Sequence, residues 1–85
     1  MSHLADFKIG KVTHYYDKIK VAVVDLSASL HVGDFVHFSG SSDFSQAIES
    51  MQMEHEQVEA AAKGDTVGVK VSQAVKPGDE VLKAG

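Results

Sequence analysis

Hydrophobic and polar residues alternate with a period of two in two stretches of this chain, as expected for β-strands with one buried face. In residues 19–23, isoleucine and two valines share one parity, and lysine and alanine occupy the other. In residues 67–72, valine occupies every second position. Four further strands are predicted at about residues 7–15, 35–38, 44–53 and 81–82. The pattern therefore predicts an all-β chain.

The first predicted strand departs from simple alternation. Phe7 and Ile9 share a parity that Val12 does not, so a β-bulge at Gly10 is predicted to reset the register. Tyr16-Asp17 is predicted to be the short hairpin connection to the next strand.

Residues 54–63 give conflicting signals. They contain strong helix formers and are followed by Gly64, a favourable residue after a helix C-terminus. However, Val58 is the only large apolar residue in the stretch, so a helix would have little to bury. We therefore predict a strand end followed by a loop or a single turn.

The pattern Gly-Asp-x-Val occurs three times, at residues 33–36, 64–67 and 78–81. Glycine adopts positive φ at no steric cost, aspartate can hydrogen-bond the backbone just beyond a turn, and valine favours strands. Each copy is therefore predicted to be a turn that opens a strand. Many short strands separated by glycine turns indicate a barrel or sandwich, and closure into a barrel would remove exposed edges.

The length and composition are those of one small domain. The 85 residues are predicted to form a single β-barrel domain at 7–83, preceded by an N-terminal tail at 1–6. The absence of cysteine excludes disulfides and cysteine-based zinc sites. The longest apolar stretch, Val21–Val24, is far too short for a membrane helix, and the N-terminus lacks a signal-peptide pattern. No membrane contact and a cytoplasmic location are expected.

The charge balance bears on the choice of partner. The net charge is −4, and all eight basic residues are lysine. Proteins that bind nucleic acid through phosphate contacts usually carry a patch rich in lysine and arginine. The composition therefore argues against tight, autonomous binding of nucleic acid.

Several segments, in this order along the chain, resemble one family of β-barrels. They are Ile9–Val12, Leu30–Val36, Ile48–Met51, Met51–Gln57 and Gly64–Gly68. Together they resemble the second domain of translational GTPases, with elongation factors Tu and 1-alpha as the closest comparison, over residues 7–82. A related barrel occurs as the C-terminal appendage of U32 peptidases and as small free-standing elongation-factor-like proteins. The resemblance implies a closed antiparallel β-barrel of about six strands.

The residues that could carry chemistry do not form a recognisable motif. Residues 10–13 lack the upstream glycine of a phosphate-binding loop, so no GTP binding is expected. Glu54, His55 and Glu56 form the densest group of potential metal ligands, but on a strand the two glutamates would face away from the histidine. We predict no catalytic residues, no cofactor and no metal site, and therefore no enzyme activity.

The candidate partner-binding surface consists of Lys11, Lys18, Lys20 and His55. Lys18 and Lys20 are predicted to share one strand face. In elongation factor Tu, the segment matching residues 54–64 carries basic residues that contact aminoacyl-tRNA. Here that segment is acidic, and its carboxylates would repel phosphates, so direct RNA binding is expected to be weak.

Three functional hypotheses follow. The first is a non-catalytic β-barrel module that binds a protein or ribonucleoprotein in translation or RNA modification. The second is a separately encoded accessory domain for a U32-type peptidase-like enzyme, which would pack against the catalytic subunit. The third is a small-ligand or metal-binding barrel that uses His55 and neighbouring carboxylates.

Overall fold

The computed structural model describes residues 6–84, which contain ten β-strands and no helix. The strands are β1 (Asp6–Tyr16), β2 (Val21–Leu26), β3 (Leu30–His31), β4 (Phe35–Ser39), β5 (Asp43–Ala47), β6 (Met51–Met53), β7 (Glu56–Val58), β8 (Ala60–Ala61), β9 (Thr66–Lys70) and β10 (Glu80–Ala84). The predicted all-β class is confirmed. Of the predicted tail at 1–6, residues 1–5 lie outside the described part.

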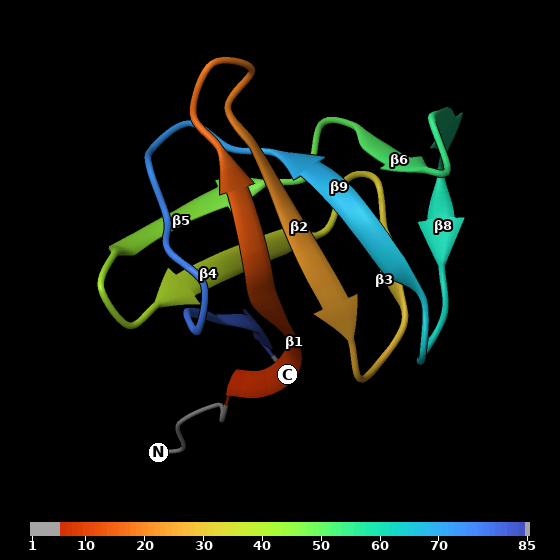
Figure 1. The fold of residues 1–85 in the computed structure, drawn as a ribbon. Helices are drawn as coiled ribbons and strands as arrows, with labels where there is room; N and C mark the ends of the chain where they lie inside the picture. Colours follow the sequence, from red (N-terminus) through yellow and green to blue (C-terminus); the bar gives the residue numbers. More distant parts are fainter. Residues whose placement is uncertain (1–5, 85) are drawn as a thin grey trace.

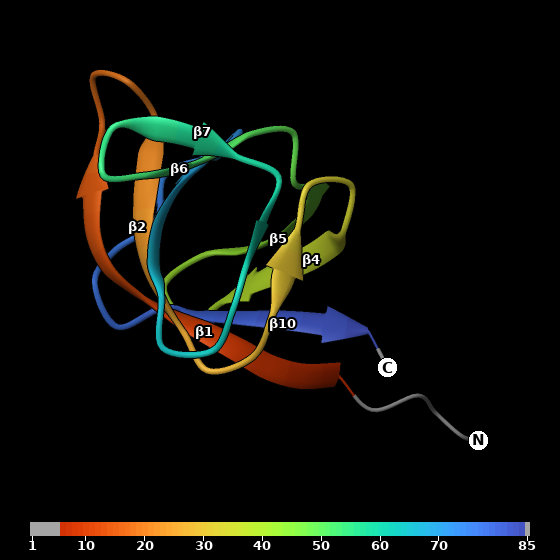
Figure 2. The same cartoon turned by 90° about the vertical axis from the view of Figure 1, so that its right-hand side faces the viewer.

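Eight strands form one antiparallel sheet in the order β5-β4-β10-β1-β2-β9-β6-β7, and β3 pairs with β8 separately. Figure 1 shows the sheet curling so that β4 and β5 pass behind β1 and β2. Figure 2 shows the β6–β7 hairpin at the top and β10 beside β1 at the bottom. Among the described strands no ladder joins the edge strands β5 and β7. The predicted closed barrel of about six strands is therefore wrong, because the fold is an open half-barrel of eight strands.

An interruption of the strand predicted at 44–53 accounts for part of this difference. β5 ends just before Ile48, and β6 begins three residues later. Ile48 leaves the ladder to bind a turn: its N–H donates to the Asp34 carbonyl and its carbonyl accepts from the Gly33 N–H, both at 2.8 Å. Burial of Ile48, which is 1% exposed, holds this corner in place.

One side chain spans the opening between β5 and the end of β9. The Gln46 amide donates to the Lys70 carbonyl and accepts from the Ser72 N–H, both at 2.8 Å. These two bonds imitate strand pairing, but a single side chain makes them. The half-barrel is bridged at this point without a continuous ladder.

The predicted bulge in β1 is confirmed. The pairing of β1 with β10 shifts between Lys8 and Gly10, and Ile9 and Val12 are both buried despite their different parity. A Cβ on Gly10 would lie 2.6 Å from a methyl carbon of Val24. Glycine is therefore required where β1 packs closely on β2.

The turn between β1 and β2 is longer than the predicted two residues. Tyr16 pairs with Val21, which leaves residues 17–20 to form the turn. Lys18 and Lys20 therefore lie in a turn, and the prediction that they share a strand face is wrong. The positive φ of Lys20, 56°, ends this turn and allows β2 to begin.

The core is formed by the inner faces of the strands. In β2 the inner residues are Ala22, Val24 and Leu26, so Val21 and Val23 face outward. The largest fully buried side chains are Phe38, Leu30, Ile48 and Met51. Phe44 stacks on Phe38 with ring centroids 4.9 Å apart, and Met53 packs against the same cluster. Met51 is therefore part of the core, and Met53 is partly buried at its edge.

Residues 54–61 form a turn and two short strands. Glu54 and His55 make a tight turn with φ of 52° and 69°, the left-handed conformation of a type I′ hairpin. β7 then pairs with β6, and Val58 lies opposite Met51 and packs against the core. The predicted strand end and turn are confirmed, but β7 and β8 replace the predicted loop. One anchor, Val58, suffices for a strand because β6 supplies its backbone partners.

The three Gly-Asp turns share one geometry. The glycine φ values are 98°, 93° and 99°, and each aspartate carboxylate accepts from the N–H three residues earlier at 2.9–3.1 Å. The aspartate N–H donates to the carbonyl of that same residue at 3.0 Å. A positive φ at the third position only is typical of a type II turn. The predicted turns are confirmed, but each carboxylate binds the backbone before the turn and not beyond it.

Each turn is also bound to a buried residue on another part of the sheet. The glycine N–H donates to the carbonyl of that residue, whose own N–H donates to the aspartate carbonyl, with all distances at 2.8–2.9 Å. The three buried residues are Ile48, Leu26 and Val12. The turns therefore form three equivalent corners of the half-barrel.

The third corner carries a buried carboxylate. Asp79 is 3% exposed and accepts from the Lys76 N–H, the Ser41 N–H and the hydroxyls of Ser41 and Ser42, at 2.9–3.1 Å. Burial raises the pKa of Asp79, but the hydrogen bonds from Ser41, Lys76 and Ser42 outweigh it and leave the pKa lowered. A Cβ on Gly40 would lie 2.6 Å from this carboxylate, so the loop approaches it only with glycine there.

Asp79→Asn is expected to lower the free energy of unfolding by about 2–3 kcal/mol, because the new amide donors face donors of the loop. Asp65→Asn is the matched control, since Asp65 occupies the same turn position and its carboxylate accepts a hydrogen bond from the Ala62 N–H of its own turn. The neighbouring Thr66 hydroxyl donates to Asp25 and not to Asp65. We expect the control to cost about 1 kcal/mol or less. Urea unfolding measures both, and equal losses would contradict a special role for Asp79.

The stability contributed by Asp79 is expected to depend on pH. Its lowered pKa means that this stability is fully present above the unfolded pKa of aspartate, about 3.9, and is lost as the pH falls through the folded pKa. The difference in free energy of unfolding between wild type and Asp79→Asn should therefore shrink below about pH 4. Asp34, whose pKa is also lowered, is present in both proteins and cancels. A difference that stays constant from pH 7 to pH 2 would be inconsistent with this account.

Candidate functional site

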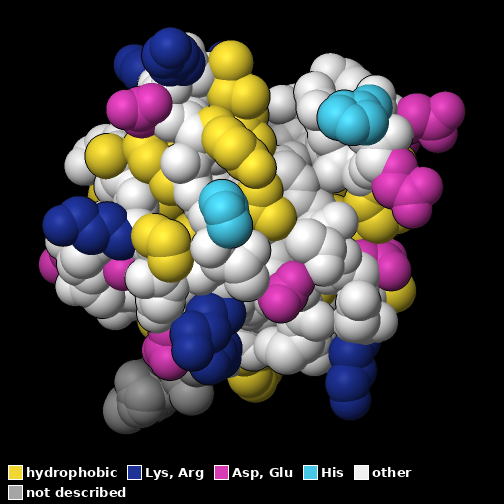
Figure 3. Space-filling view, in the orientation of Figure 1, with side chains coloured by type: hydrophobic (Ala, Val, Ile, Leu, Met, Phe, Trp, Pro, Cys, Tyr) yellow, Lys and Arg dark blue, Asp and Glu magenta, His cyan; other side chains and the backbone are white. Residues whose placement is uncertain are grey.

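A groove of about 420 Å³ lies on the outer face of the sheet, and we call it the outer groove. It is defined by Tyr16, Ile19, Val21, Val23, Gly68 and His55. The β1–β2 turn forms one wall, the β6–β7 hairpin forms the other, and β2 and β9 form the floor. Figure 3 shows hydrophobic side chains gathered over the β1–β2 turn and β2, beside a recess that borders the β6–β7 hairpin.

Strand pairing explains the depression in the floor of the outer groove. Gly68 lies between Val23 on β2 and Gln52 on β6, in one cross-strand row. A Cβ on Gly68 would lie 3.1 Å from a methyl carbon of Val21. The missing side chain at Gly68 therefore leaves a depression between an apolar strand and a polar hairpin. Glycine inside a strand often marks a place where another backbone approaches closely.

The apolar wall is formed by side chains that are well exposed. Ile19 is 57% exposed and Tyr16 is 50% exposed. The ring of Tyr16 stacks on His14, with centroids 5.9 Å apart, and His14 pairs with Val23 across the strands. The stacked rings extend the apolar floor onto β1.

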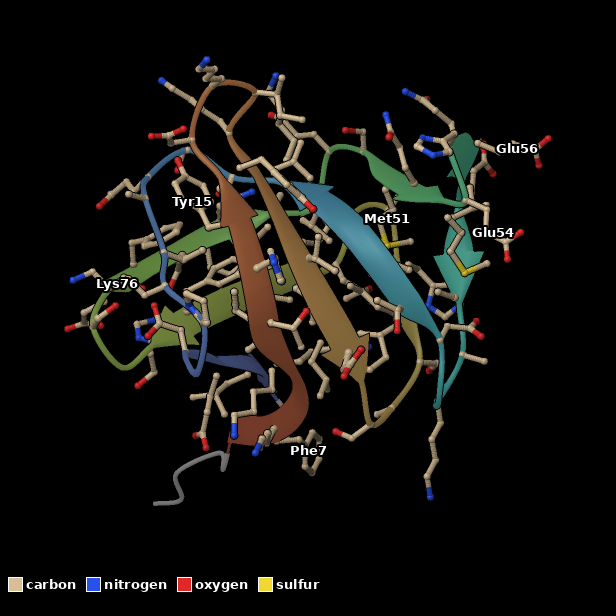
Figure 4. All side chains as sticks on the ribbon, viewed as in Figure 1. Phe7, Tyr15, Met51, Glu54, Glu56 and Lys76 are labelled. Carbon is tan, nitrogen blue, oxygen red and sulfur yellow. The ribbon has the colours of Figure 1, made fainter. Side chains whose placement is uncertain are left out.

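The two walls carry charges of opposite sign. Lys18 and Lys20 flank Ile19 in the β1–β2 turn, and neither forms an ion pair with another described residue. Glu54 and Glu56 project into solvent from the β6–β7 hairpin, as Figure 4 shows. The β1–β2 turn is therefore basic, and the β6–β7 hairpin is acidic.

The backbone of both walls is strained. The non-glycine residues with positive φ in the described range are Lys20, Glu54 and His55, and all three lie in these two turns. Such conformations cost on the order of 1–3 kcal/mol each and cluster at functional sites. Their concentration around the outer groove supports its choice as the candidate site.

The four predicted binding residues fall into two groups. His55 lines the outer groove, and Lys18 and Lys20 are the sequence neighbours of Ile19, which also lines it. Lys11 lies roughly 15 Å away along β1, where it pairs with Asp25 on one side and Glu80 on the other. The fold therefore brings three of these residues around one surface and places the fourth between two acidic residues. Binding by any of them stays a prediction.

The apolar part of the outer groove was not predicted from the sequence. Val21, Val23 and Gly68 belong to strands whose outer face the alternation alone does not indicate. The signal that could have found them is Gly68, a glycine in the middle of a strongly alternating strand.

The titratable groups with shifted pKa values have structural roles. Asp34, like Asp79, has a lowered pKa: burial raises it, but the His31 N–H and the Lys83 ammonium group, 3.1 Å away, outweigh that effect. His37 lies at the surface of β4 and is bonded to Asp43 and Ser45 of β5. These contacts join turns and strands, and none of the three residues Asp34, Asp79 and His37 lines the outer groove.

Within residues 6–84, no group of three or more histidine, aspartate or glutamate side chains is arranged to hold a metal ion. No helix in that range is long and apolar enough to cross a membrane.

Comparison with known sequences connects the chain to peptidases. No protein-family model matches it. An uncharacterized protease of Methanocaldococcus jannaschii is 38% identical over 76 residues, which cover 87% of this chain and 19% of that protein. A collagenase of Porphyromonas gingivalis is 30% identical over 78 residues, or 88% of this chain and 22% of that protein. The chain thus spans about a fifth of the length of these relatives.

Comparison with solved structures agrees. The C-terminal domain of a U32 peptidase of Geobacillus thermoleovorans, in its selenomethionine variant, superposes with a TM-score of 0.85 at 28% identity, covering 89% of this chain and 98% of that domain. A second structure of that domain gives a TM-score of 0.81 at 25% identity, covering all of this chain. The predicted relation to the U32 C-terminal barrel is supported, whereas these relatives do not show the predicted resemblance to the second domain of elongation factors.

Glu54→Asn/His55→Gly is expected to raise the free energy of unfolding by about 1–2 kcal/mol, because Asn-Gly favours the left-handed turn that Glu54 and His55 adopt under strain. Glu56→Asn/Gln57→Gly is the matched control, since it makes the same kind of change within β7. The control should lower stability by about 1 kcal/mol, because glycine weakens a strand. Urea unfolding compares the two variants. Destabilisation by both would contradict the claim that the Glu54-His55 turn is strained.

Proposed function

We propose that this chain is a non-catalytic accessory domain that works with the catalytic part of a U32-type peptidase and acts by protein–protein contact. The observation that carries the proposal is the likeness to the C-terminal domain of a U32 peptidase, which covers nearly all of that domain. The curated relatives support it, because the matched residues make up only about a fifth of each protease. The chemistry of such proteins would then lie outside the region that this chain matches.

The distribution of polar groups also favours a non-catalytic role. A carboxylate that acts as a general acid or base near neutral pH usually has a raised pKa and access to a substrate. The buried carboxylate of Asp79 is already bonded to Ser41, Ser42 and Lys76, and Asp34 is bonded to His31 and Lys83. Neither carboxylate has a position from which it could serve a substrate in the outer groove.

The proposal corresponds to the second hypothesis drawn from the sequence. The first, a module for translation or RNA modification, has no support from the relatives described above. The acidic hairpin with Glu54 and Glu56 further opposes contact with phosphates. RNA binding therefore enters only as an alternative outcome of the experiment.

A purified catalytic region of a U32-type peptidase from the same organism is expected to form a stoichiometric complex with this chain. The complex should survive ribonuclease treatment, because the contact joins two proteins. Size-exclusion chromatography with light scattering measures the stoichiometry. The chain alone is expected to leave a fluorescent gelatin substrate uncleaved.

Two results would contradict the protein–protein contact, and a third would contradict the non-catalytic role. One is the absence of a complex at protein concentrations of about 100 μM, where even weak specific contacts are occupied. The other is recovery of ribonuclease-sensitive material only, which would restore the RNA hypothesis. Gelatin cleavage that persists through a second purification would show that the domain itself is catalytic.

A further inference from the structure

A serine, a histidine and an aspartate are hydrogen-bonded to one another on the outer face of β4 and β5. His37 on β4 pairs directly with Ser45 on β5, and Asp43 lies two residues before Ser45 on the same face. The Nδ1 atom of His37 lies 2.7 Å from the Ser45 hydroxyl, and its Nε2 atom lies 2.7 Å from a carboxylate oxygen of Asp43. We call these three residues the His37 cluster. It was not predicted from the sequence, because only strand pairing brings the three side chains together.

The position of each proton in the His37 cluster follows from the hydrogen-bond partners. An ionised carboxylate can only accept hydrogen bonds, so the Nε2 atom that faces Asp43 carries the proton of the neutral ring. The Nδ1 atom is then an acceptor, and the Ser45 hydroxyl donates to it. A hydroxyl bonded to a base that a third group orients is the arrangement that activates serine as a nucleophile. His37 is therefore placed to take the proton of Ser45.

The exposure of the His37 cluster restricts the reaction that it can support. Ser45 is exposed, so a reagent can reach its hydroxyl, and the side chain of His37 is 34% exposed. The side chain of Asp43 is 86% exposed, so water competes for its bond to His37. A reaction on such an open strand surface proceeds without the exclusion of water that a closed active site provides. We therefore expect reaction with esters that have a good leaving group, and not with peptide bonds.

Apolar side chains lie beside the His37 cluster on the same face of the sheet. Leu82 of β10 pairs with His37, and Phe35 lies two residues before His37 on β4. Ala47 pairs with Phe35 and lies two residues after Ser45. Phe35 is 62% exposed, so an apolar acyl chain bound to Ser45 could pack against it and leave water. The surroundings thus favour reagents with an apolar acyl chain.

We propose that Ser45 is a nucleophile that accepts the acyl group of activated esters with an apolar acyl chain. The Ser45 oxygen forms a bond to the carbonyl carbon of the ester while its proton passes to Nδ1 of His37. The bond between that carbon and the leaving oxygen then breaks, and the leaving group takes the proton from His37. The products are acyl-Ser45 and a free alcohol or phenol, so no other reactant is needed. The proposal does not rest on the accessory function, and a single acylation of each chain is compatible with a non-catalytic role.

The first experiment uses p-nitrophenyl butyrate as the probe, in neutral buffer with the intact chain. Peptide mass spectrometry follows acylation at each residue over time, and acylation of the lysines serves as an internal measure of the reagent. Ser45 should react about tenfold faster than Ser29 and Ser72, since a general base accelerates attack by a hydroxyl. Both are exposed serines whose hydroxyls make no hydrogen bond with another residue of 6–84. Equal rates at the three serines would overturn the proposal.

Variants of histidine test the base. His37→Gln keeps a polar side chain beside Ser45 but removes the proton acceptor, so acylation of Ser45 should slow about tenfold. His31→Gln is the matched control, because His31 also faces an aspartate, Asp34, but lies in another turn. The control should leave the rate unchanged. A rate at Ser45 that His37→Gln does not lower would also overturn the proposal.

A second pair of variants tests the apolar surroundings. Phe35→Ser should slow acylation of Ser45 by p-nitrophenyl butyrate about threefold and leave the rate with p-nitrophenyl acetate unchanged, because only the longer acyl chain buries apolar surface there. Ile19→Ser removes a similarly exposed side chain from the β1–β2 turn and should leave both rates unchanged. An equal effect of Phe35→Ser on the two esters would contradict the preference for apolar acyl chains.

Asp43 is a positioning residue, and its test needs a readout other than the rate. In Asp43→Ala, the ¹⁵N chemical shifts of the His37 ring should show a larger fraction of the Nδ1–H tautomer, and acylation of Ser45 should slow. An unchanged tautomer ratio would remove Asp43 from the proposal.

The outcomes separate this proposal from the accessory function. If the complex with the catalytic region forms but Ser45 reacts no faster than Ser29, the accessory function stands and Ser45 is not an activated nucleophile. If Ser45 reacts as described but no complex forms, the nucleophile stands and the accessory function fails. Release of p-nitrophenolate that continues after acylation is complete, and that Ser45→Ala abolishes, would support Ser45 as the nucleophile and contradict the non-catalytic role.

Discussion

The buried carboxylate of Asp79 is the interaction on which the arrangement of this half-barrel most depends. It accepts hydrogen bonds from the β4–β5 loop through Ser41 and Ser42, and from its own turn through Lys76. The backbone of the same residue binds Val12 in β1. β10 is thereby held between β1 and β4, in the middle of the strand order. Because a buried charge is stable only when its hydrogen bonds are made, the loop and the turn must form together.

Much of this frame follows from the sequence. Gly-Asp is visible three times, and type II turn geometry explains why glycine must precede an aspartate that binds back to the chain. The bulge at Gly10 also follows from the sequence. Ile9 and Val12 are three residues apart, so a regular strand could not bury both side chains on one face. The sequence of each turn does not indicate which distant residues bind to it. Burial of Asp79 at 3%, in contrast to the more exposed Asp34, depends on a loop almost forty residues away in the chain.

The parts that could not be predicted are those where tertiary contacts override local preference. Glu54-His55 is not a favoured pair for a type I′ turn, so the sequence predicted a strand end and a turn in residues 54–63 but not the β6–β7 hairpin. The hairpin forms because Met51 and Val58 pair across it and pack on the core. Likewise, the longer turn before Val21 depends on where β1 and β2 pair, and this places Lys18 and Lys20 at its tip. The candidate site is built from these two turns, so its residues were visible in the sequence but its geometry was not.

The sheet separates stability from binding. Along β2, Ala22 and Val24 are buried in the core, while Val21 and Val23 face the groove. Along β9, Val67 and Val69 are buried on either side of Gly68. The outer face can therefore change its chemistry without disturbing the core, because alternate residues of a strand point to opposite faces. The fold also tolerates the strained turns at Lys20 and His55, because the three Gly-Asp corners that hold the half-barrel together lie elsewhere. A small open barrel of this kind can serve as a stable base for a surface whose specificity is set by two short turns.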